Sequence, residues 1–202
     1  AVTKLSSLIS LGITAERYSL LGSAYKRKLM LLKPESKKEF TGTLESSSKA
    51  YFDAAKVSDY KNAYPINNGV QLGRIYELIS DQEFPFEGKS KMKFNKVMDD
   101  LEKLIEFKPK EKKDYWDLVT ETNVLLSRIL IDKKPTKKSW ENLKNSYQDV
   151  WVKAGSTSDR MGELEHLDTL IKGLEYAGSE EAKALGESLN NLKADLAKGK
   201  EV

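Results

Sequence analysis

Residues 14–32 read TAERYSLLGSAYKRKLMLL, and this stretch decides the fold. Its spacing is that of an amphipathic helix, because Tyr18, Leu21 and Tyr25 fall on one helical face. Gly22 lies next to Leu21 and, having no side chain, lets a neighbouring helix come close. A helix of this kind buries its apolar face only against stacked neighbours. The sequence therefore predicts a set of packed helices around this segment.

The same pattern returns in the stretch AYPINNGVQLGRIYELI, residues 63–79. There Leu72, Gly73 and Tyr76 repeat the L-G-x2-Y spacing of the first stretch. This spacing is typical of the first helix of a tetratricopeptide repeat (TPR), with Tyr18 at the position of the repeat's tryptophan. The interval between the two glycines is longer than one TPR unit, so we expect expanded repeats.

Composition and periodicity favour an all-α fold. Leu, Lys, Glu and Ala are plentiful, and each of the five prolines fits near a helix boundary. We expect a TPR-like right-handed array of antiparallel helix hairpins, with about nine helices, forming a single domain over residues 1–202 that is cut from a larger protein. The expected helices cover residues 2–11, 14–32, 36–60, 63–79, 94–105, 116–131, 136–154, 161–177 and 179–196.

Several residues predict where helices begin and where they are weak. Thr14 can cap the first long helix, and Ser36 with Glu39 forms a capping-box signature for the next one. The early turns of that next helix are expected to be loose, because Gly42 and the run 46–48 of serines are poor helix formers.

The second half of the chain carries similar signals. Thr136 and Ser179 can each cap a helix. Trp116 has the spacing of a core residue in the helix expected over residues 116–131, so we expect its ring to be buried.

The charge balance and the absence of cysteine exclude several classes of protein. There are 34 basic and 31 acidic side chains, a net charge of +3 that does not indicate a nucleic-acid or membrane protein. Without cysteine the chain has no disulfide, no thiolate nucleophile and no cysteine-ligated metal. No apolar run approaches the roughly 20 residues that span a bilayer, and the N-terminus lacks a signal-peptide pattern. We expect a cytoplasmic protein.

Three segments in order, 16–28 (ERYSLLGSAYKRK), 64–73 (YPINNGVQLG) and 114–126 (DYWDLVTETNVLL), resemble successive motifs of the TRAFs-binding domain. That TPR-like domain occurs in MAP kinase kinase kinases of the apoptosis-signal-regulating group, and in bacterial proteins with CHAT proteases or other effector domains. The family's Tyr-Pro-x-Ile-Asn motif is one residue shorter here, as YPIN, and its Tyr-Trp helix start matches Tyr115-Trp116. The resemblance implies a regulatory interaction scaffold without catalytic activity.

No reaction is visible in the sequence. His166 is the only histidine, and Glu163-x-x-His166 matches only half of a di-iron bundle motif. With Asp159 it is expected to form a surface cluster on a solvated helix face. The pair Asp99-Asp100 points in two directions from a helix and lacks an orienting partner. We expect no catalytic residue, no metal and no cofactor. The alternative among enzymes is a helical enzyme whose active site the sequence does not reveal.

Two lysine-rich stretches, 108–113 and 133–138, support the alternative of a nucleic-acid-binding helical array. They bracket a helix of about 20 residues and so lie roughly 30 Å apart along its axis. Glu111 lies within the first stretch and Asp132 directly precedes the second, and these acidic residues weaken the basic character of both. Solvated loops between helices are the favoured interpretation.

The favoured function is a helical-repeat scaffold that binds protein, as the regulatory domain of a larger signalling or defence protein. First helices line a TPR groove, and alignment of the two repeats places five polar or basic side chains there, which would favour an acidic peptide or helix. Helix capping by Asn67-Asn68, and simple solvation by the charged residues, are the alternatives. The expected partner-binding residues are Ser23, Lys26, Arg27, Asn67 and Arg74.

Overall fold

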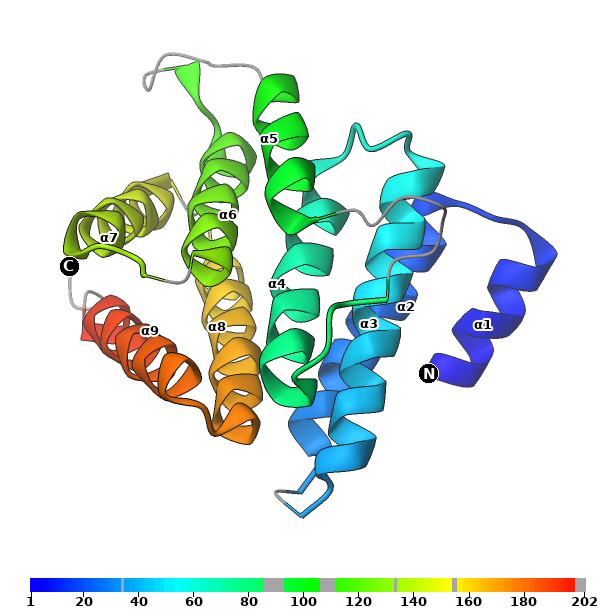
Figure 1. Ribbon diagram of the computed structural model, residues 1–202. Helices are drawn as coiled ribbons and strands as arrows, with labels where there is room; N and C mark the ends of the chain where they lie inside the picture. The colour runs from blue at the N-terminus through cyan, green and yellow to red at the C-terminus, as the bar shows by residue number, and fades with distance from the viewer. Residues whose placement is uncertain (34, 86–92, 106–111, 133, 154–155, 199–202) are drawn as a thin grey trace. The chain divides into compact units, whose positions relative to one another are not determined.

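The computed structural model describes residues 1–33, 35–85, 93–105, 112–132, 134–153 and 156–198 (Figure 1). Nine α-helices and no strand occur in those ranges, so the all-α prediction is confirmed. The chain divides into two compact units, unit 1 over residues 1–105 and unit 2 over residues 106–202. The expectation of one domain over the whole length stays a prediction. None of the described helices is long and apolar enough to cross a bilayer.

Unit 1 contains five helices, whose ends follow local sequence signals. Thr14 caps α2, accepting a hydrogen bond at its Oγ1 from Arg17 N at 3.1 Å, and Asn62 Oδ1 caps α4 by accepting from Tyr64 N at 3.0 Å. The guanidinium of Arg17 also donates to the carbonyls of Leu8 and Gly12, which ties the end of α1 to α2. The helices are α1 (Val2–Leu11), α2 (Ala15–Leu31), α3 (Lys37–Val57), α4 (Ala63–Ser80) and α5 (Phe94–Leu104).

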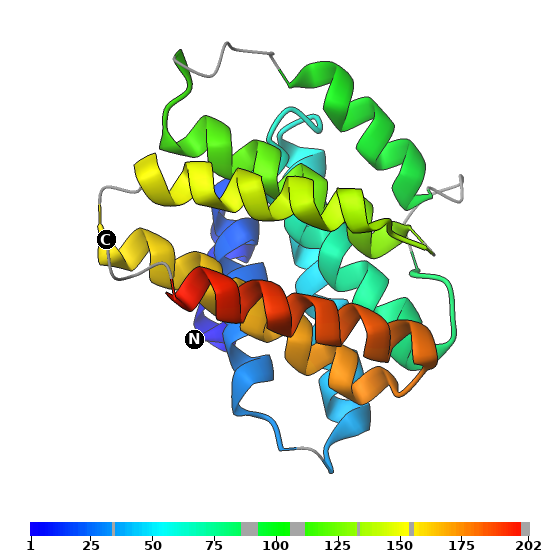
Figure 2. The same cartoon turned by 90° about the vertical axis from the view of Figure 1, so that its left-hand side faces the viewer.

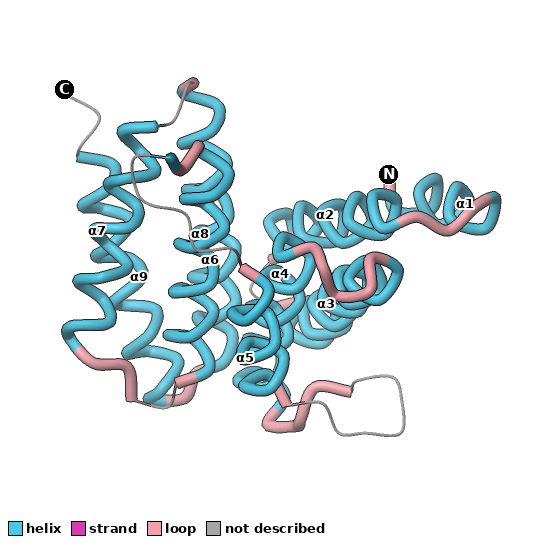
Figure 3. The backbone as a smooth tube through the Cα atoms, turned by 90° about the horizontal axis from the view of Figure 1, so that it is seen from above, coloured by secondary structure: helices cyan, strands magenta, loops and turns pink. Residues whose placement is uncertain are grey.

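The helices α2, α3 and α4 pack side by side, with α3 contacting both neighbours (Figures 1 and 3). A Cβ placed on Gly22 would lie 2.8 Å from the Tyr51 ring, and one on Gly73 would lie 2.7 Å from the Phe94 ring. Both distances are shorter than real carbon contacts, so a side chain at either position would have to displace the ring. The prediction that the two L-G-x2-Y glycines lie at close helix contacts is confirmed.

The serine-rich part of α3 is not loose, contrary to the expectation from its sequence, but forms a continuous helix at the centre of unit 1. Ser47 Oγ donates to the Gly22 carbonyl of α2 at 2.7 Å, and Ser48 Oγ donates to the Gly69 carbonyl of α4 at 2.8 Å. The small serines let the backbones approach, and their hydroxyls are satisfied by the neighbouring helices. Ser36 precedes α3 as expected, but its side chain makes no capping hydrogen bond.

An aromatic cluster joins α3, α4 and α5. The Phe84 ring lies 5.7 Å from the rings of Phe52 and Tyr76 and 6.0 Å from that of Phe94, centroid to centroid. Because Phe84 comes after the end of α4, the cluster holds the described segment 81–85 against the helices.

Unit 2 contains two packed helix pairs, α6 with α7 and α8 with α9, and α7 also lies beside α9 (Figure 2). Capping boxes open α6 at Asp114 and α8 at Ser156, whereas Gly178 ends α8 in the left-handed conformation. Thr136 and Ser179 also accept cap hydrogen bonds, as predicted for both. The helices are α6 (Tyr115–Ile131), α7 (Lys137–Lys153), α8 (Thr157–Ala177) and α9 (Glu180–Lys198).

Apolar side chains from all four helices are buried in unit 2, and those of α9 are spaced as expected, at Ala182, Leu185, Leu189, Leu192 and Leu196. One aromatic residue differs from its prediction. Trp116 is not buried in the core, because its side chain is 70% exposed at the first turn of α6. Helical spacing gives the direction of a side chain, and the first turn of a helix can extend past its neighbours.

Candidate functional site

The candidate site lies in unit 1, where α2 faces the start of α4. Lys26 Nζ donates to Asn68 Oδ1 at 3.2 Å, and Asn68 Nδ2 donates to the Tyr64 carbonyl at 3.0 Å. The amide of Asn68 is thus held inside the first turns of α4 with its oxygen toward α2. This contact links two helices that both pack on α3.

Tyr51 of α3 adjoins Tyr64 at the start of α4, and its side chain is fully buried. Its hydroxyl oxygen is 3.5 Å from that of Tyr64, and the two rings meet edge to face with centroids 5.9 Å apart. Burial, followed by the proximity of Tyr64, raises the pKa of Tyr51 well above its ordinary value. A hydrogen bond with Ser23 and the charge of Arg27 oppose that rise, which places both α2 residues near the Tyr51 hydroxyl.

Arg27 is a cation of this site for which the described part of the chain supplies no ion-pair partner. Its side chain is exposed, and it makes no hydrogen bond or ion pair with any residue that the structure describes. The next residue, Lys28, differs because its ammonium lies 2.8 Å from a Glu39 carboxylate oxygen. A planar guanidinium at this position can accept a carboxylate in a bidentate hydrogen bond.

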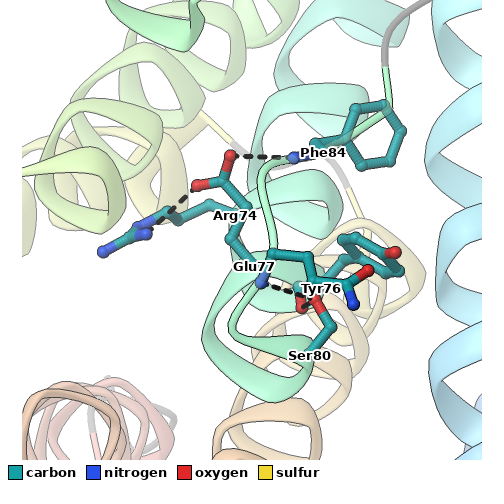
Figure 4. Close-up of polar contacts among 6 residues, drawn as sticks. Arg74, Tyr76, Glu77, Ser80 and Phe84 are labelled. Carbon is teal, nitrogen blue, oxygen red and sulfur yellow. Dashed lines mark hydrogen bonds and ion pairs between the residues drawn. The ribbon is translucent and has the colours of Figure 1, made fainter.

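The other two predicted residues lie elsewhere on α4. Arg74 Nη1 is 3.1 Å from Glu77 Oε2, while Glu77 Oε1 accepts a hydrogen bond from Phe84 N, also at 3.1 Å (Figure 4). The Arg74 side chain is only 15% exposed, so its charge serves to fix the end of α4 and the segment after it. Asn67 is 2% exposed inside α4. The capping interpretation of Asn67-Asn68 is wrong, since Asn62 caps this helix.

The structure therefore brings together Ser23, Lys26 and Arg27, and adds Tyr51, Tyr64 and Asn68, which the sequence did not predict as site residues. A signal for two of them was present, because Tyr64 and Asn68 are four residues apart and share a helix face. Their partners on α2 and α3 could not be identified from that spacing. These six side chains, here called the Tyr51 site, form the candidate functional site.

The residues considered for acid–base or metal chemistry lie on α5 and α8. Among the described residues, no group of three or more His, Cys, Asp or Glu side chains is placed to hold a metal ion. His166 is buried, not on the solvated face that was expected. Burial, with the carboxylates of Glu163 and Asp159 nearby, raises the pKa of Tyr115 to about 12, so this hydroxyl stays protonated at neutral pH.

The two lysine-rich stretches are only partly described. Most of 108–113 lies outside the described residues, and so does Lys133. Lys113 precedes α6 and is mostly buried. Its ammonium forms an ion pair with Glu121 of α6 at 2.7 Å, so this lysine is held against that helix.

Comparisons with models of known protein families, with curated proteins and with solved structures gave no match to this chain. The resemblance to the TRAFs-binding domain stays a prediction. An assignment of function therefore depends on the geometry and the chemistry of the described residues.

Proposed function

We propose that the chain is a non-catalytic, TPR-like scaffold that binds protein, as the regulatory domain of a larger signalling or defence protein. The observation that supports this most is the Tyr51 site, where Ser23 and Arg27 interact with the buried Tyr51 hydroxyl and Lys26 bonds to Asn68 in α4. A packed aromatic floor with polar groups and a cation at its rim is the kind of surface that binds a peptide or a helix.

The chemistry of the rim favours an acidic partner. Arg27 carries a charge that no described residue neutralises, and Lys26 lies one position away on α2. A carboxylate brought to this rim would form a charge-assisted hydrogen bond, stronger than one between neutral groups. Arg74 does not contribute to the proposed surface, because its guanidinium is paired with Glu77.

A photo-crosslinking residue placed at position 27 tests the proposal in cells that express the intact chain. The matched control carries the same residue at Lys96, which is 74% exposed on α5 of the same unit. We expect one discrete crosslinked protein from position 27 and none from position 96. The identified protein, once purified, should bind the chain and lose affinity for an Arg27→Glu variant. No crosslinked protein at position 27, or the same products from both positions, would overturn the proposal.

A further inference from the structure

The outward face of α2 carries apolar side chains where a surface helix usually has polar ones. At 100° per residue, Leu21 and Leu29 point toward α3, whereas Leu20, Arg27 and Leu31 fall on the opposite side. Leu20 is 49% exposed and Leu31 is 83% exposed. We call this face the α2 outer face; its residues are Leu20, Arg27, Met30 and Leu31, all of them exposed.

The order of these residues along the helix indicates where a partner would need apolar side chains and where it would need an acidic one. Leu20 and Leu31 are three turns apart, about 16 Å along the axis, and the unpaired guanidinium of Arg27 lies between them. A second helix lying along this face could place apolar side chains on both leucines and a carboxylate on Arg27. Single exposed leucines need no explanation. Three large apolar residues around one cation that no described residue pairs with, however, form a patch that suits a partner with both apolar and acidic side chains.

We propose that the α2 outer face binds an acidic amphipathic helix of a partner protein, with its apolar residues against Leu20, Met30 and Leu31 and a carboxylate against Arg27. This inference rests on the proposed function, and it names the partner's chemistry and the side of α2 that the partner covers. Arg27 belongs to both the α2 outer face and the Tyr51 site, so the partner helix would reach the rim of that site.

The experiment uses the intact chain and a probe peptide of about 18 residues, an amphipathic helix with leucines on one face and flanking glutamates. A second peptide has every glutamate replaced by lysine. Binding is measured by fluorescence polarisation. We expect the acidic peptide to bind and the basic one to bind at least about tenfold more weakly, because each reversed charge removes an attraction and adds a repulsion.

Variants of the chain then locate the site. Arg27→Glu should weaken the acidic peptide about tenfold or more, and the double change Leu20→Ser with Leu31→Ser should also weaken it. The control Lys96→Glu makes the same charge reversal on α5 and should leave the affinity unchanged. All the changed side chains are exposed, so circular dichroism melting should confirm that each variant is folded. If the leucine variant does not fold, Arg27→Glu alone decides.

Two results with the peptides and with vesicles would each overturn the inference. One is an acidic peptide that fails to bind, or that binds the Arg27→Glu chain as well as the original. The other is tighter, Leu20- and Leu31-dependent binding to vesicles of anionic phospholipid, which would assign the face to a membrane surface. The failure of the proposed function is separate: a crosslinked partner that binds the Arg27→Glu chain normally overturns this inference, whereas the absence of any crosslinked partner overturns the proposed function.

Discussion

In unit 1 the glycines of α2 and α4 lie under aromatic rings of the neighbouring helices, whereas in unit 2 Gly162 of α8 has no atom within 4 Å of a Cβ placed on it. Unit 1 adds hydrogen bonds from buried serine hydroxyls to the carbonyls of the facing helices. In unit 2, ion pairs join Lys144 of α7 to Asp195 of α9 at 2.6 Å and Lys193 of α9 to Asp168 of α8, as Lys28 and Glu39 join α2 to α3 in unit 1.

The difference shows two ways to join helices in one chain. Close backbone approach in unit 1 needs small residues at particular positions, and a larger side chain there has no space. Unit 2 buries leucines and aromatic rings among its helices, and its ion pair between Lys144 and Asp195 lies where the helices meet solvent. The L-G-x2-Y pattern occurs twice, both times in unit 1, so the sequence itself distinguishes the two halves.

The largest effect is expected from the leucines of unit 2. Leu189 of α9 is fully buried, so Leu189→Ala should lower the free energy of unfolding by about 2–5 kcal/mol through lost burial and the cavity left behind. Urea unfolding followed by circular dichroism measures it. Leu104→Ala, at an exposed leucine of α5, is the control and should change stability by less than about 0.5 kcal/mol. Equal effects in the two variants would show that α9 is not packed as described.

A glycine variant of unit 1 comes next. Gly22→Leu should cost about 1–3 kcal/mol, because the new side chain overlaps the Tyr51 ring. The matched change Gly162→Leu in α8 should leave stability unchanged or raise it by up to about 1 kcal/mol, since leucine is the better helix former. Urea midpoints of the two variants give the comparison. Unchanged unfolding of the Gly22→Leu chain would contradict the close contact between α2 and α3.

Replacing tyrosine by phenylalanine should raise the stability of the chain at one buried position and lower it at another. The hydroxyl of Tyr147 in α7 is buried and has no hydrogen-bond partner among the described residues, so Tyr147→Phe should stabilise the chain by about 1 kcal/mol. Its ring keeps the edge-to-face contact with Trp151. The hydroxyl of Tyr51 contacts Tyr64 and Ser23, so Tyr51→Phe should destabilise by about 0.5–1.5 kcal/mol. Thermal unfolding of both variants decides, and a loss of stability in the Tyr147 variant would show that its hydroxyl is satisfied.

The smallest effect is expected from the ion pair of α7 and α9. The hydrogen bond from Lys144 lowers the pKa of Asp195, so the carboxylate is favoured in the folded state relative to the unfolded chain. Its contribution is present above the ordinary aspartate pKa and is lost as the pH falls through the lowered folded value. Asp195→Asn should therefore be slightly less stable than the original at neutral pH and equal to it in strong acid. Concentrated salt should shrink the difference as well, and a difference that persists in acid would have another cause.

The sequence by itself determined the helices of this protein and two of their closest contacts. Apolar periodicity and local caps depend on neighbouring residues, so Thr14 and Gly178 mark helix ends without tertiary information. Gly22 and Gly73 were recognisable because the surrounding L-G-x2-Y pattern places them beside the buried face. Three residues of the candidate site were predicted from the same L-G-x2-Y alignment, namely Ser23, Lys26 and Arg27.

Tertiary structure alone decided how deeply each side chain is buried and what it meets. Trp116 has the spacing of a core residue and is exposed, because periodicity gives a direction and not the extent of the neighbouring helix. Ser47 and Ser48 look like weak helix positions, yet they bond to carbonyls of two other helices. Arg74 is paired with Glu77 while Arg27 is unpaired among the described residues, a difference set by side-chain contacts in the folded chain, which one-dimensional spacing does not contain.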